Sequence, residues 1–204
     1  MRIAEMKIIV SVLSRALGWS MLSILLKSLR RKNDVFKATS WAGQQTEEAK
    51  FAQRVAISSA IYLTLTERIG QEHAFELMRQ MLVPIGVQEQ LANIRDLKGS
   101  DDWERLQAFY NFMGLGGVGQ FVERTLVENN EHKLHYEVRN CFFYRFYSQA
   151  DTPELTQFFC EVDDAFFAAA FPGYRFHRGS SMLNTVAHGQ EHCDFIFEKV
   201  PPPA

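Results

Sequence analysis

The sequence changes character at a glycine-rich stretch, residues 114–119. Before this stretch, apolar residues recur at helical spacing. After it, two pairs of strand-like runs lie on either side of one helical run. Helices grouped before paired strands favour an α+β fold with an antiparallel sheet. We therefore predict N-terminal helices packed on an antiparallel sheet that is built from a C-terminal β-β-α-β-β unit.

The same change sets the expected domain organisation. A hydrophobic N-terminal helix at 1–32 precedes a single α+β domain at 33–204, which is helical over 46–115 and contains the sheet over 120–199. The glycine stretch connects these two parts of the domain. It follows a helix and lacks a Lys-Ser/Thr pair, so it does not fit a phosphate-binding loop.

Local signals place the ends of the predicted elements. Thr46 is the N-cap expected before a helix that has Glu47 and Glu48 in its first turn and ends at Ile69, before Gly70. The other predicted elements are, in chain order, a loop at 33–45, a helix at 71–97 that is kinked or broken at Pro84 and Gly86, a helix opened by Asp101 and Asp102 that runs through Phe112, strands at 120–128 and 133–147, a helix with Thr152 as N-cap that runs to Phe171, and strands at 174–186 and 193–199.

An apolar segment near the N-terminus has three interpretations. Residues 8–26 contain one charged residue, Arg15, and four basic residues follow: Lys27, Arg30, Arg31 and Lys32. The segment suits a helix docked on the protein, an interfacial membrane helix with a basic flank, or a membrane span. The second interpretation places a membrane surface among the expected partners, contacted through residues 8–32.

Composition limits the remaining partners. The 204-residue chain has 22 Lys and Arg against 24 Asp and Glu, and this balance argues against nucleic-acid binding. Its three cysteines are widely spaced and include no CxxC pair, which predicts a reducing, cytoplasmic setting without a disulfide framework. The 17 phenylalanines predict an aromatic core or an aromatic-lined pocket for a small-molecule substrate.

Reactive residues crowd the C-terminal part of the chain. Cys160 and Asp163 are three residues apart on a predicted helix and so share one face, where a buried Asp163 needs a partner such as Arg178. On the last predicted strand, alternation places Cys193 on the aromatic face. That face also carries Phe195 and Phe197, whereas Asp194 and Ile196 point to the opposite face. His188 and His192 flank the start of this strand, whereas three other histidines are expected to face solvent: His73, His132 and His135.

This part of the sequence resembles the L-2-amino-thiazoline-4-carboxylic acid hydrolase family. The resemblance rests on Cys141, a Pro153-Glu154-Leu155 helix start, a Cys160-x-x-Asp163 pair, Arg178, and a Gly189-x-x-x-Cys193-Asp194-Phe195-x-Phe197 ending. It implies a hydrolase that opens a small cyclic amidine at a carbon-nitrogen bond, on a route to cysteine.

Two mechanisms remain open for such a ring opening. A thiolate activated by histidine could attack the carbon between nitrogen and sulfur, or Asp163 could act as the base for a water molecule. The predicted catalytic residues are Cys160, Asp163, Cys193 and His192. The predicted substrate-binding residues are Arg178, Asp194, Phe159 and Phe197. Arg178 would hold the substrate carboxylate.

A different class of function fits the same element order. Helices followed by β-β-α-β-β with an aromatic interior also resemble non-catalytic small-ligand or lipid-binding modules of the vinyl-reductase (4VR) type. No cofactor is expected. Cys160, Asp163, His192 and Cys193 could ligate a metal by residue type, but no tight spacing supports such a site.

Overall fold

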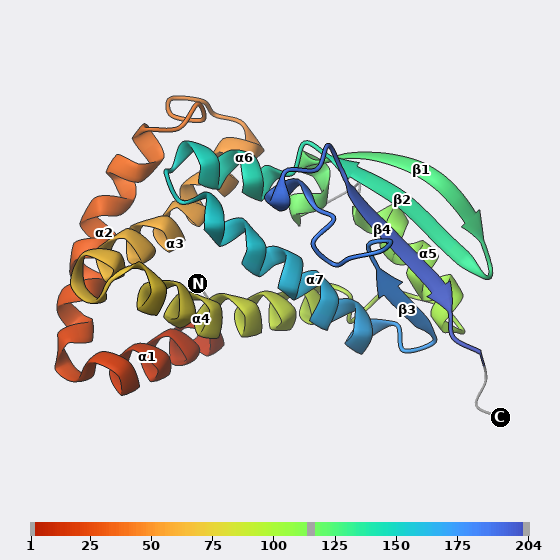
Figure 1. The fold of residues 1–204 in the computed structure, drawn as a ribbon, viewed down its shortest axis with the longest axis horizontal. Helices are drawn as coiled ribbons and strands as arrows, with labels where there is room; N and C mark the ends of the chain where they lie inside the picture. The colour runs from red at the N-terminus through yellow and green to blue at the C-terminus, as the bar shows by residue number, and fades with distance from the viewer. Residues whose placement is uncertain (1–2, 114–116, 202–204) are drawn as a thin grey trace. The chain divides into compact units, whose positions relative to one another are not determined.

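The computed structural model describes residues 3–113 and 117–201. These residues form an α+β fold, as predicted, in two compact units. The first unit is Met1–Gly86 with Phe146–Phe158, and the second is Val87–Arg145 with Phe159–Ala204. Figure 1 shows the helices and strands along the chain.

Helices make up the first unit. They are α1 (Ile3–Leu17), α2 (Met21–Lys37), α3 (Glu47–Ile69) and the first part of α4 (Gln71–Asn93). α2 buries Ile24, Ser28 and Val35, and α3 is rich in buried alanines, which allow another helix to approach closely. Lys27 and Arg31 on α2 form ion pairs of 2.5 and 2.6 Å with Glu67 on α3.

The N-terminal apolar segment forms two helices rather than one. A short 3-10 turn, Gly18–Ser20, separates α1 from α2, and Gly18 has a φ of 57°, which glycine adopts at little cost. The stretch Glu5–Lys37 is nevertheless long and apolar enough to cross a membrane, by length and composition alone. The predicted loop at 33–45 is wrong in its first part, because α2 continues to Lys37 with Val35 buried at helical spacing from Ile24 and Ser28.

The predicted limits of α3 are confirmed. The Thr46 side chain accepts a hydrogen bond of 3.1 Å from the Ala49 N–H, and Gly70 ends the helix with a φ of 82°. The start of α4 at Gln71 is also confirmed, but the helix continues through Pro84 and ends at Asn93 rather than Leu97.

Replacing the N-cap residue Thr46 should lower the stability of the protein measurably. Thr46→Ala removes the acceptor for the Ala49 N–H, and we expect the free energy of unfolding to fall by about 1 kcal/mol. Urea unfolding followed by circular dichroism measures this loss. Thr46→Ser keeps a hydroxyl acceptor and should unfold like the natural protein. An equal loss in both variants would contradict the capping role.

The segment Phe146–Phe158 is tied into the first unit by side-chain hydrogen bonds to α3. Tyr147 Oη lies 2.9 Å from Ser58 Oγ, and Thr152 Oγ1 lies 2.8 Å from Ser59 Oγ. Thr152 stands at the predicted N-cap position, before a turn that begins with Pro153, but its hydroxyl is hydrogen-bonded to Ser59 and makes no capping hydrogen bond. A 3-10 turn, Pro153–Leu155, precedes α7 (Thr156–Ala170).

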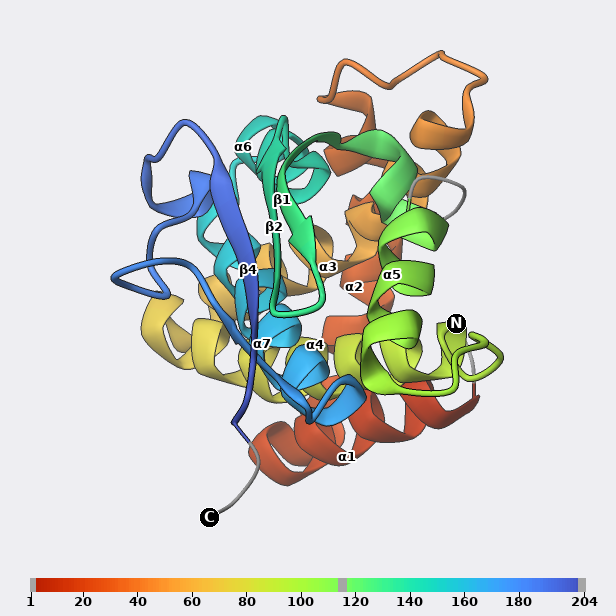
Figure 2. The same cartoon turned by 90° about the vertical axis from the view of Figure 1, so that its right-hand side faces the viewer.

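The second unit contains a four-stranded antiparallel sheet in the order β1-β2-β4-β3. Its strands are β1 (Glu123–Asn130), β2 (Lys133–Arg139), β3 (Tyr174–His177) and β4 (Cys193–Lys199), which Figure 2 shows side by side. One face packs on α5 (Asp102–Met113) and α7 through a cluster of buried aromatic rings, which includes Phe109, Phe166, Phe167, Phe171, Phe176, Phe195 and Phe197.

Two of the predicted strands are too long. The chain leaves β2 at Asn140, whose φ of 53° is left-handed, and residues 142–147 belong to a helix, α6 (Phe142–Gln149). β3 ends at His177, and a loop at 178–192 with a short 3-10 turn, Val186–His188, connects it to β4. The predicted connection at 114–119 lies partly outside the described residues, and Gly117–Phe121 is a 3-10 turn.

Candidate functional site

A buried ion pair joins α7 to the end of β3. Arg178 Nη2 donates a hydrogen bond of 2.7 Å to Asp163 Oδ2, which confirms the predicted pairing of these residues. Arg178 is only 1% exposed. Its guanidinium lies over the rings of Phe176 and Phe195, 5.1 and 4.3 Å from their centroids. Such cation–π contacts stabilise a guanidinium that has been removed from water.

The pKa of the Asp163 carboxyl group lies close to neutral pH. Burial raises the pKa of Asp163 to about 6, because removal from water disfavours the carboxylate, and the positive charge of Arg178 only partly opposes this rise. About a quarter of the side chain (24%) still reaches the surface. A partly accessible carboxyl with such a pKa suits general acid–base catalysis.

Three thiols lie near the ion pair. Cys141, Cys160 and Cys193 each lie close enough to Asp163 to interact with it electrostatically. Burial raises the pKa of each thiol to about 11, so all three are protonated at neutral pH. The thiolate is the nucleophilic form of cysteine, and this environment therefore favours the carboxylate mechanism over the thiolate mechanism.

The loop at 178–192 lies beside two of the thiols, Cys160 and Cys193. The Val186 N–H donates to Cys193 Sγ at 3.2 Å, and the hydroxyl of the fully buried Thr185 partly opposes the rise that burial causes in the pKa of Cys160. Thr185 Oγ1 also lies 2.9 Å from Nδ1 of His188. The sequence prediction missed Thr185, because residues up to 186 resemble a strand and a single loop threonine carries no periodic signal.

Two buried donors at this site lack acceptors. Among the residues that the structure describes, Arg178 Nε and Tyr136 Oη are buried polar atoms with no hydrogen-bond partner. Tyr136 is fully buried on β2, and the pKa of its hydroxyl is raised well above 10 by burial and next by the charge of Asp163. Both groups therefore stay protonated and can donate. An unpaired buried donor is costly, and it needs an explanation.

The sequence prediction missed Tyr136 as well. Its alternation with Leu134 and Val138 on β2 is the pattern of a core residue, and all three are buried. The polar end of a tyrosine in such a row is the one signal that could have marked it, because a buried hydroxyl usually has a partner.

Two further predicted residues differ in their surroundings. Phe159 is partly exposed, and its ring stacks on Phe143 with centroids 3.5 Å apart. Phe197 is fully buried among Tyr136, Phe167 and Phe176 and presents no exposed surface to a substrate. The predicted substrate-binding role of Phe197 therefore finds no support in its placement.

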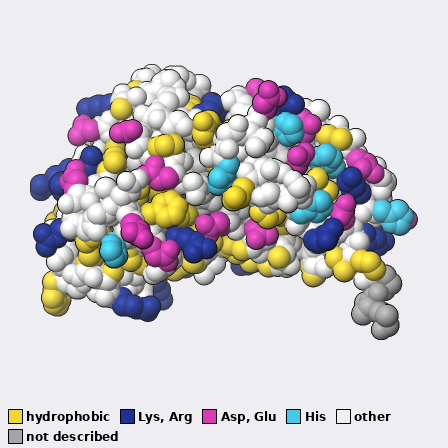
Figure 3. Space-filling view, in the orientation of Figure 1, with side chains coloured by type: hydrophobic (Ala, Val, Ile, Leu, Met, Phe, Trp, Pro, Cys, Tyr) yellow, Lys and Arg dark blue, Asp and Glu magenta, His cyan; other side chains and the backbone are white. Residues whose placement is uncertain are grey.

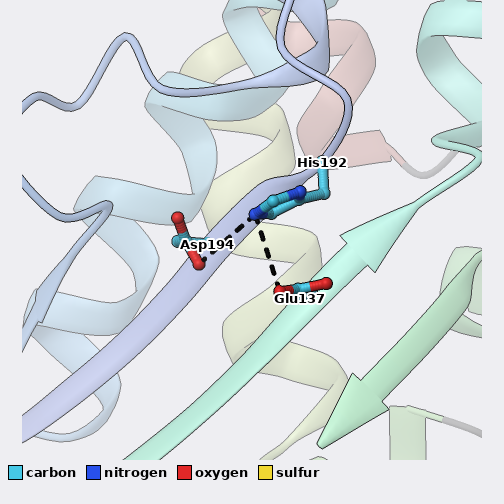
Figure 4. A group of neighbouring side chains, drawn as sticks. All are labelled: Glu137, His192 and Asp194. Carbon is cyan, nitrogen blue, oxygen red and sulfur yellow. Dashed lines mark ion pairs between the residues drawn. The ribbon is translucent and has the colours of Figure 1, made fainter. Parts of the chain in front are cut away.

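His192 lies with a different group of side chains. Its Nε2 atom is 3.7 Å from Glu137 Oε1 and 3.8 Å from Asp194 Oδ1. Figure 3 shows histidines among acidic side chains on the surface, and Figure 4 shows this trio converging. Asp194 points away from the face that carries Cys193, so the structure separates the carboxylates around His192 from Asp163 and the thiols.

His135 departs from its predicted position. It was expected to face solvent, but its side chain is 17% exposed and its Nε2 lies 2.7 Å from Asp194 Oδ1. The register explains this contact, because His135 pairs with Ile196 and Glu137 pairs with Asp194 across β2 and β4. His132 is exposed, as expected, at the turn before β2.

The fold and this site define an α+β protein with a buried carboxylate–guanidinium pair among thiols. The family model of L-2-amino-thiazoline-4-carboxylic acid hydrolase matches residues 48–197, which is more than half of the chain. The chain belongs to this family, and the match does not favour a 4VR-type binding module. No curated protein and no solved structure matches the chain.

Proposed function

We propose that this protein is an enzyme that hydrolyses 2-amino-thiazoline-4-carboxylate or a closely similar cyclic amidine, opening the ring at a carbon–nitrogen bond. The family name supports the reaction class. The observation that carries the proposal is the Asp163 carboxyl, whose pKa is about 6 and which accepts a hydrogen bond from the buried guanidinium of Arg178. The Nε–H of this guanidinium has no acceptor among the described residues.

Asp163 acts as the base for water in this reaction. Its carboxylate removes a proton from a water molecule, whose oxygen attacks the ring carbon between nitrogen and sulfur. Asp163 returns this proton to the ring nitrogen, which gives a tetrahedral intermediate with a hydroxyl group. Asp163 then transfers the hydroxyl proton to the same nitrogen as the carbon–oxygen double bond forms and the electron pair of the carbon–nitrogen bond leaves with the nitrogen. Water is thereby added across the bond, and the product is a carbamoyl-cysteine with a free amine.

Arg178 and Tyr136 bind the substrate in this proposal. Arg178 Nε and the Tyr136 hydroxyl donate to acceptor atoms of the substrate, which explains why both donors are unpaired among the described residues of the free protein. Both atoms are closed to solvent, so a ligand needs an opening, and we propose that the loop at 178–192 moves to provide it. Gly179 and Gly189, with φ of 74° and 88°, lie near its two ends.

Turnover of the thiazoline acid by the purified full chain tests the proposal. Mass spectrometry detects carbamoyl-cysteine, and amine and thiol reagents separate its two isomers. A free amine shows that the carbon–nitrogen bond breaks, whereas a free thiol shows that the carbon–sulfur bond breaks and the bond assignment is wrong. Absence of any product would overturn this substrate.

The pH dependence of turnover should follow Asp163. We expect kcat/KM to fall about tenfold per pH unit below pH 6, where the base is protonated, and to level off above it. The stability of the protein should change with pH in the opposite direction to turnover. Because the folded-state pKa is raised, the contribution of Asp163 is fully present below its unfolded value near 3.8 and is lost as the pH rises through about 6. A kcat/KM profile that is flat between pH 5 and pH 7 would contradict the assignment of Asp163 as the base.

A further inference from the structure

The geometry points to a binding site for a first-row divalent cation on the outer face of the sheet, formed by Glu137, His192 and Asp194. One ligand atom from each of these residues lies within 4.8 Å of the other two. Two ligands of the same ion, each bound at about 2.0–2.2 Å, can be up to about 4.2 Å apart. The distances from His192 Nε2 to the two carboxylates, 3.7 and 3.8 Å, fall within this span.

These distances are too long for hydrogen bonds, so His192 Nε2 is not satisfied by either carboxylate. The other ring nitrogen, Nδ1, is buried and has no hydrogen-bond partner among the described residues. Within the described ranges, the partly buried imidazole of His192 therefore makes no hydrogen bond that would hold it between the two carboxylates. An ion bound by Nε2 and both carboxylates would give the imidazole a bonded partner and neutralise the negative charges.

Neighbouring side chains orient both carboxylates. Arg139 Nη2 donates to Glu137 Oε2 at 2.8 Å, which leaves Oε1 for the ion. His135 Nε2 lies 2.7 Å from Asp194 Oδ1 and holds that carboxylate in place. Such second partners orient metal ligands, and their removal typically weakens binding about 10- to 100-fold. The three ligands are 22% to 29% exposed, so an ion can reach them from solvent.

Mn²⁺ is the most informative probe, because carboxylate and imidazole ligands suit it whereas the three thiols of this chain do not. Free Mn²⁺ measured by electron paramagnetic resonance gives the stoichiometry for the chelator-treated full chain. We expect one bound ion that Zn²⁺ displaces. His192→Ala should weaken binding about 100-fold and His135→Ala about tenfold. His132→Ala, which alters an exposed histidine outside the site, should leave it unchanged.

This readout is binding, so it is independent of the proposed reaction. Circular dichroism and the melting temperature confirm that each variant is folded. Absence of a saturable Mn²⁺ site, or equal affinity in His192→Ala and the natural protein, would overturn the inference. Loss of binding in His132→Ala to the same degree would overturn it as well.

A second inference rests on an independent observation in the first unit. We infer that the outer face of α2 binds an anionic phospholipid surface. Leu22, Leu26 and Leu29 form a row at helical spacing on α2, and Trp19 lies in the 3-10 turn just before this helix. All four are exposed, Trp19 to 89% and Leu29 to 60%. The opposite side of the helix buries Ile24 and Ser28, so one face docks on the protein while the other faces solvent.

Charge indicates the kind of partner. At 100° per residue, Arg30 and Lys32 fall on either side of the row, and Lys37 continues it. Cations that flank an exposed apolar row with a tryptophan at one end are typical of a helix that lies in the interface of a membrane with anionic lipids.

Sedimentation with phospholipid vesicles tests this inference. The full chain should bind vesicles of phosphatidylcholine with phosphatidylserine, less at high salt, and Trp19 fluorescence should shift to the blue. The double variant Leu26→Glu with Leu29→Glu should not bind. Leu183→Glu is the matched control, because Leu183 is also 60% exposed but lies in the loop at 178–192.

Three results would overturn it. The first is absence of binding, and the second is equal binding to phosphatidylcholine alone, which would remove the role of charge. The third is a dimer that the double glutamate variant abolishes, without vesicle binding, which would assign the row to a second copy of the chain.

Discussion

Asp163→Asn should lower kcat/KM for the thiazoline acid by about 10²- to 10⁴-fold, the range typical of a lost general base. Asparagine keeps the shape of the side chain and an acceptor for Arg178 Nη2, but it cannot remove a proton from water. The pH dependence near 6 should disappear in the residual activity. Asp164→Asn is the matched control, because Asp164 is the next residue of α7 and is exposed. It should retain full turnover.

The same substitution also tests the structural role of the pair. Asp163→Asn leaves the guanidinium of Arg178 buried without a counter-charge, as protonation of Asp163 does below about pH 6. Because the raised pKa of Asp163 favours a neutral side chain in the folded protein, we expect the variant to stay folded. If the variant unfolds, the double variant Asp163→Asn with Arg178→Met removes both charges and should restore the fold, measured by thermal unfolding. Full turnover in folded Asp163→Asn would show that another group is the base.

Much of the fold follows from local signals in the sequence. The Thr46 cap, the end of α3 at Gly70 and the run Cys193–Lys199 each depend on a few neighbouring residues, and each was predicted correctly. The errors arose where tertiary packing decides the conformation. Residues 142–147 alternate like a strand, but the fully buried Phe142 and Phe146 lie four residues apart on one face of α6.

The candidate site was predictable where a single face held the relevant residues. The spacing of Cys160 and Asp163 on α7, and the need of a buried carboxylate for a partner, led to Arg178. The His192 cluster was not predictable in the same way. It depends on the register that places Glu137 opposite Asp194 across β2 and β4, and register is a long-range property that the sequence of either strand does not show.

Tyr136→Phe should change stability and activity in opposite directions. The hydroxyl is buried without a partner among the described residues, so its removal should raise the free energy of unfolding by about 1 kcal/mol. If the hydroxyl donates to the substrate, the same change should lower kcat/KM by about 10- to 100-fold, since a hydrogen bond to a charged group is worth about 1.5–3 kcal/mol. Urea unfolding and steady-state kinetics measure the two effects on one preparation.

Tyr147→Phe separates this interpretation from a general effect of losing a buried hydroxyl. Tyr147 is also fully buried, but its hydroxyl lies 2.9 Å from Ser58 Oγ in the first unit. Its removal breaks a hydrogen bond and should lower stability by about 1 kcal/mol while leaving kcat/KM unchanged. The two variants thus differ in the sign of the stability change and in the response of activity. If Tyr136→Phe gains stability and keeps full activity, its hydroxyl is an unsatisfied core group and takes no part in binding substrate.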